Sequence, residues 1–166
     1  MQMLNRYFTP FALMLILSAI YFSEPEPRAI KLSLAILAAS TLVNWWFSAN
    51  TYRFIRWTRE MRMVQVWLNY LWAVPLFYLL QPFWGPMWLL FVMAPVTAAL
   101  YESWWQTLVT ASVSAFTMLV LYWLGGMEGG AFWGMAGIHA SFIIIFSLFV
   151  NSLAQVALRL RDMTPR

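Results

Sequence analysis

The stretch AFWGMAGIHASFIIIFSLFVNSLAQVAL, residues 131–158, decides the fold, because it contains no Asp, Glu, Lys or Arg. A helix crosses the hydrocarbon core of a bilayer in about 20 apolar residues and satisfies its own backbone amides there. The stretch therefore predicts a transmembrane helix.

The rest of the chain has the same character. Of its 166 residues, 63% are hydrophobic and 10% are charged, and the mean hydropathy is +0.69. Soluble domains contain about 25% charged residues. We expect no soluble domain, and an all-α, polytopic membrane protein with one transmembrane domain over residues 1–166.

Six apolar stretches are separated by polar or helix-breaking segments, which predicts a bundle of about six helices. The first resembles a signal peptide in length, but no small-residue cleavage pattern precedes Ser23, which favours a retained helix. The expected spans are about 7–22, 29–49, 64–81, 87–101, 107–124 and 131–158.

The basic residues indicate the orientation. If the chain crosses the membrane six times, both termini and the loop 50–63 lie on the same side. Eight of the ten Lys and Arg residues fall in these segments. Cytoplasmic loops carry such an excess, so both termini are expected in the cytoplasm of a bacterial inner-membrane protein. The eight are Arg6, Arg53, Arg56, Arg59, Arg62, Arg159, Arg161 and Arg166.

Four arginines, Arg53, Arg56, Arg59 and Arg62, recur at every third residue. This spacing occurs in voltage sensors, which also need acidic partners inside the membrane. The acidic residues of this chain all fall at expected helix ends or loops. The arginines are therefore expected to contact anionic lipid headgroups.

Five polar residues fall within or near the spans and are the candidate intramembrane positions. Polar groups in hydrocarbon are expected to face the bundle and bond across helices, where they join helices or line a ligand pocket. Pro75 and Pro95 fall in the third and fourth spans and free backbone carbonyls there. The five candidates are Asn44, Asn69, His139, Asn151 and Gln155.

Catalysis is not expected. His139 is the single histidine and there is no cysteine, so bis-histidine haem, Cys-ligated zinc and iron–sulfur clusters are excluded. No nucleophile–base pair, carboxylate pair or phosphate-binding glycine loop is evident. We expect no cofactor, no metal and no nucleic-acid partner. The expected partners are the lipid bilayer and other membrane helices, in a homodimer or a hetero-complex.

The segment LLFVMAPVTAALYESWWQTLVTASVSAFTMLVLYWL, Leu89 to Leu124, carries a family resemblance. It resembles the fourth and fifth helices of the six-helix membrane sensor domains of bacterial histidine kinases, such as the type IV pilus sensor kinases. Pro95-Val96, Ala98 and Ala99 match that pattern, and Asn69 stands where the family often has Asp. The resemblance covers roughly Arg53 to Met163.

This resemblance implies a sensor domain of a two-component signal transduction system. The catalytic histidine, the nucleotide-binding part and the linking coiled coil of those kinases are absent from the chain. The leading hypothesis is thus a non-catalytic, sensor-like or partner-binding membrane module. The alternatives are a structural subunit of a larger membrane complex and a small solute transporter or substrate-capture subunit.

The membrane assignment has a direct test. We expect the purified chain to stay folded and monodisperse only in detergent, nanodiscs or liposomes, because its apolar surface has no other suitable solvent. Size-exclusion chromatography and circular dichroism check this. A folded, monodisperse chain in plain buffer would contradict it.

Overall fold

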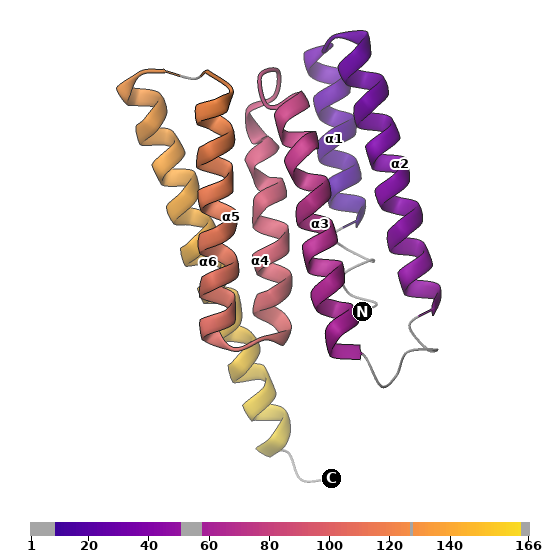
Figure 1. The fold of residues 1–166 in the computed structure, drawn as a ribbon. Helices are drawn as coiled ribbons and strands as arrows, with labels where there is room; N and C mark the ends of the chain where they lie inside the picture. Colours follow the sequence, from indigo (N-terminus) through magenta and orange to yellow (C-terminus); the bar gives the residue numbers. More distant parts are fainter. Residues whose placement is uncertain (1–8, 51–57, 127, 164–166) are drawn as a thin grey trace. The chain divides into compact units, whose positions relative to one another are not determined.

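The computed structural model describes residues 9–50, 58–126 and 128–163. These form six α-helices and one short 3-10 helix, with no strand among them (Figure 1). The elements are α1 (Thr9–Ser23), α2 (Pro27–Asn50), α3 (Thr58–Leu80), η3 (Gly85–Leu89), α4 (Leu90–Tyr101), α5 (Trp104–Leu124) and α6 (Gly130–Met163).

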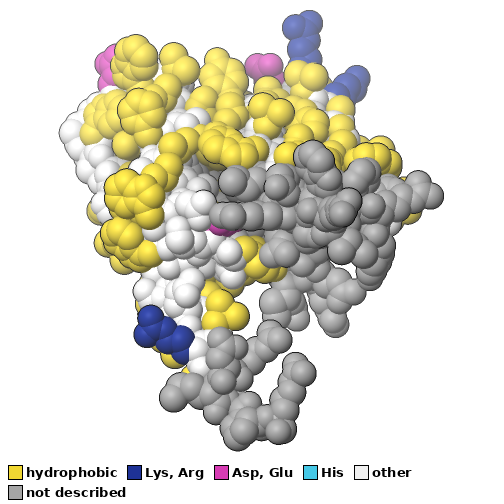
Figure 2. All heavy atoms as spheres, turned by 60° about the horizontal axis from the view of Figure 1, so that its bottom comes forward, with side chains coloured by type: hydrophobic (Ala, Val, Ile, Leu, Met, Phe, Trp, Pro, Cys, Tyr) yellow, Lys and Arg dark blue, Asp and Glu magenta, His cyan; other side chains and the backbone are white. Residues whose placement is uncertain are grey.

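Three of these helices are long and apolar enough to cross a membrane. They comprise residues Pro27–Phe47, Trp104–Leu124 and Gly130–Leu160. The other apolar helical segments in the described residues, Thr9–Ser23, Trp67–Leu80 and Gly85–Tyr101, are shorter. Hydrophobic side chains cover much of the molecular face in Figure 2, as expected for a surface that contacts lipid.

The starts of two helices are set by a proline and by a capping box, and both lie before the boundaries that the apolar pattern predicts. α2 begins at Pro27, because the fixed φ of proline suits the first helical position. α5 begins at Trp104, because Ser103 and Gln106 form a capping box in which the Gln106 amide lies 3.4 Å from the Ser103 hydroxyl. Both helices thus start before the predicted spans.

Two longer helices extend into regions expected to be polar. α3 begins at Thr58, so its first two turns occupy part of the predicted loop 50–63. α6 ends at Met163, five residues beyond the expected boundary of 158. The added segments 58–63 and 159–163 are polar but contain no proline or glycine, so they continue the helix, and the apolar spans are therefore shorter than the helices.

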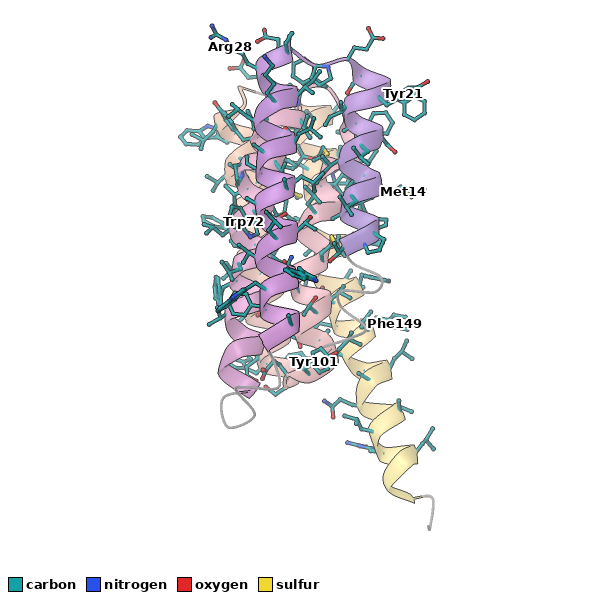
Figure 3. The ribbon with its side chains drawn as sticks, turned by 90° about the vertical axis from the view of Figure 1, so that its right-hand side faces the viewer. Met14, Tyr21, Arg28, Trp72, Tyr101 and Phe149 are labelled. Carbon is teal, nitrogen blue, oxygen red and sulfur yellow. The ribbon has the colours of Figure 1, made fainter. Side chains whose placement is uncertain are left out.

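The chain divides into two compact units, Met1–Leu90 and Phe91–Arg166. In the first unit, α1, α2 and α3 pack side by side, with Ile16, Ala19, Leu37, Phe77 and Leu80 in the core (Figure 1). In Figure 3, Met14 and Tyr21 point away from α1, and both are exposed.

In the second unit, α5 and α6 form the main helix pair. α5 buries Ala111, Ala115 and Met118, and α6 buries Ala136, Ala140, Ile143 and Ser147. Small side chains on both helices permit the close approach that stabilises helix pairs in lipid. Three further small residues of α6, Gly134, Gly137 and Ser141, are exposed and lie outside this buried set.

A bond between α4 and α5 compensates for the proline in α4. Pro95 has no amide hydrogen, so the carbonyl of Phe91, four residues earlier, lacks its helical donor. The Ser114 hydroxyl of α5 donates to that carbonyl over 2.6 Å, and Ser114 is completely buried. The helix defect therefore becomes an interhelical contact.

This compensation predicts a double-mutant cycle. Ser114→Ala should destabilise the protein by about 1–3 kcal/mol, because the buried Phe91 carbonyl is left without a donor. In a Pro95→Ala background the helix supplies the missing donor, so the same substitution should cost much less. Denaturant unfolding in detergent micelles measures both values, and equal costs in the two backgrounds would contradict the pairing.

Candidate functional site

The structure divides the five candidate polar residues between the two units, with one contact in the first and three separate positions in the second. Asn44 and Asn69 bond each other in the first unit, and His139 and Asn151 bond to different helices at two levels of α6. Gln155 is exposed.

The Asn44–Asn69 contact joins α2 to α3. The Asn44 amide nitrogen donates to the side-chain oxygen of Asn69 over 3.2 Å, and Asn44 is 9% exposed. The Asn44 side-chain oxygen is buried and has no hydrogen-bond partner among the described residues. This arrangement joins the two helices and also leaves one acceptor that can take another donor.

Asn151 supplies hydrogen-bond donors to backbone carbonyls at the C-terminal end of α4. Its side-chain nitrogen donates to the carbonyls of Ala99 and Glu102, both over 2.9 Å, and the residue is 1% exposed. The last carbonyls of a helix have no partners within the helix, so they need donors from elsewhere. Asn151 therefore attaches α6 to the corner between α4 and α5, which we call the α4–α5 corner (residues 99–104).

His139 lies twelve residues earlier on α6 and contacts α5. The Tyr122 hydroxyl is 3.2 Å from the His139 Nδ1 atom, and the Tyr122 ring packs edge-on against Phe132 at 5.1 Å. Tyr122 is 2% exposed, whereas His139 is half-buried. Twelve residues of helix span about 18 Å, so α6 meets polar partners at two well-separated levels.

Gln155 differs from the expectation that it faces the bundle. It lies one turn beyond Asn151, past the α4–α5 corner, so neither α4 nor α5 extends far enough to cover it. Among the four arginines expected at headgroups, Arg53 and Arg56 lie outside the described residues. Arg59 and Arg62 belong to the first turns of α3, but their side chains also lie outside the description.

Sequence reasoning missed Ser114, Tyr122 and the completely buried Thr107, whose hydroxyl has no partner among the described residues. The sequence held a signal only for Ser114. Pro95 predicts that a backbone carbonyl four residues earlier lacks its helical donor, but the sequence does not show which side chain replaces that donor. Within the described residues, no three His, Asp or Glu side chains gather as metal ligands.

Comparison with known proteins adds no relative. The chain matches no protein-family model, no curated protein and no solved structure.

The two hydrogen bonds of the Asn151 side chain, which we call the Asn151 clamp, can be tested with a matched pair of variants. Asn151→Leu should lower the free energy of unfolding by about 1–3 kcal/mol, because the buried Ala99 carbonyl loses its Asn151 donor. Gln155→Leu, the same type of change one turn away on an exposed face, should change it by less than about 0.5 kcal/mol. Thermal unfolding in nanodiscs compares them, and similar losses would contradict the clamp.

Proposed function

We propose that the chain is a six-span, non-catalytic module of the bacterial cytoplasmic membrane, with both termini in the cytoplasm, which senses a membrane ligand or partner through movement of α6. The proposal rests on one observation, the unequal polar contacts at the two levels of α6. The residues assigned to it are Asn151, His139 and Tyr122.

The Asn151 contact is the fixed end. Breaking it would take the Asn151 donor from the buried Ala99 carbonyl, and an unsatisfied backbone group in lipid costs several kcal/mol. Interaction with a ligand or partner helix supplies too little free energy to release such a contact easily. α6 therefore stays attached to the α4–α5 corner in either state.

The His139 contact is the releasable end. It joins two side chains, so its loss leaves no backbone group unsatisfied, and hydrogen bonds of this kind are worth only about 0.6 kcal/mol on average inside membranes. The turn between α5 and α6 also contains Gly126 and Gly129 with φ of 70° and 111°, a conformation that glycine adopts without strain. α6 can thus pivot about Asn151 and move at its His139 end.

A partner or lipid that binds better to one position of α6 would shift the population of the two positions. The exposed residues Ile138 and Ile145 lie on the moving part of α6, at 69% and 67% exposure. An apolar helix or acyl chain is the kind of ligand that such a face contacts. The cytoplasmic end of α6 would transmit the tilt to a partner protein.

Spin-label distances test the pivot. Labels on Phe116→Cys and Ile138→Cys report the releasable end, and labels on Val109→Cys and Leu153→Cys report the fixed end. Tyr122→Phe removes only one hydroxyl, and we expect it to broaden or shift the first distance while leaving the second unchanged. Bilayers of short-chain and long-chain lipids, used as the stimulus, should shift the first distance as well.

Two outcomes would remove the sensor proposal. A single, unchanging distance at the releasable end in both lipids and in the Tyr122→Phe variant would show a rigid helix pair. A shift confined to the fixed end would reverse the assigned roles of Asn151 and His139.

A further inference from the structure

We draw no further inference here: the strongest candidate, the set of buried polar atoms in the first unit that have no hydrogen-bond partner among the described residues (Ser33 Oγ, Asn44 Oδ1 and the Nε1 atoms of Trp72 and Trp84), carries no binding site, because each of these atoms exposes less than 1 Å² of surface and so leaves no space beside it for a water molecule or a ligand group.

Discussion

The requirement that every backbone amide and carbonyl find a partner without water controls this structure. Helices meet it along their length, and for this reason the described residues consist of helices joined by short connections. The requirement is hardest to meet at helix ends and at prolines. At two such places in the second unit, a polar side chain from another helix makes the bond. Ser114 serves the carbonyl freed by Pro95, and Asn151 serves the end of α4.

These two bonds explain the burial of two of the polar residues buried in the second unit, Ser114 and Asn151. Ser114 and Asn151 are each almost completely buried. Each joins α4 to another helix through a backbone carbonyl. α4 has only twelve residues, too few to cross the hydrocarbon core on its own length, so the two cross-helix bonds hold a short helix that would otherwise end without donors.

The sequence was sufficient for the helical class and for the approximate location of all six α-helices, because both follow from apolar runs and their breakers. It was insufficient for the starts of α2 and α5, where a proline and a capping box extend the helix by two or three residues. It also could not identify partners. Asn44 and Asn69 are 25 positions apart, and Asn151 is 52 from Ala99, so only the folded helix packing reveals that they meet. Gln155 resembles Asn151 in the sequence, and only the position of the α4–α5 corner separates a buried clamp from an exposed side chain.

The two kinds of polar contact differ in what their loss leaves behind. A side chain bound to a buried backbone carbonyl cannot leave without taking the donor from that carbonyl, so a contact such as that of Asn151 with Ala99 is costly to break. A contact between two side chains, such as Tyr122 with His139 or Asn44 with Asn69, can exchange for other partners at little cost. Movement in such a bundle is therefore expected where side chains pair with side chains. In α6 these two kinds of contact lie on one helix about 18 Å apart, and this separation would give the proposed pivot its lever arm.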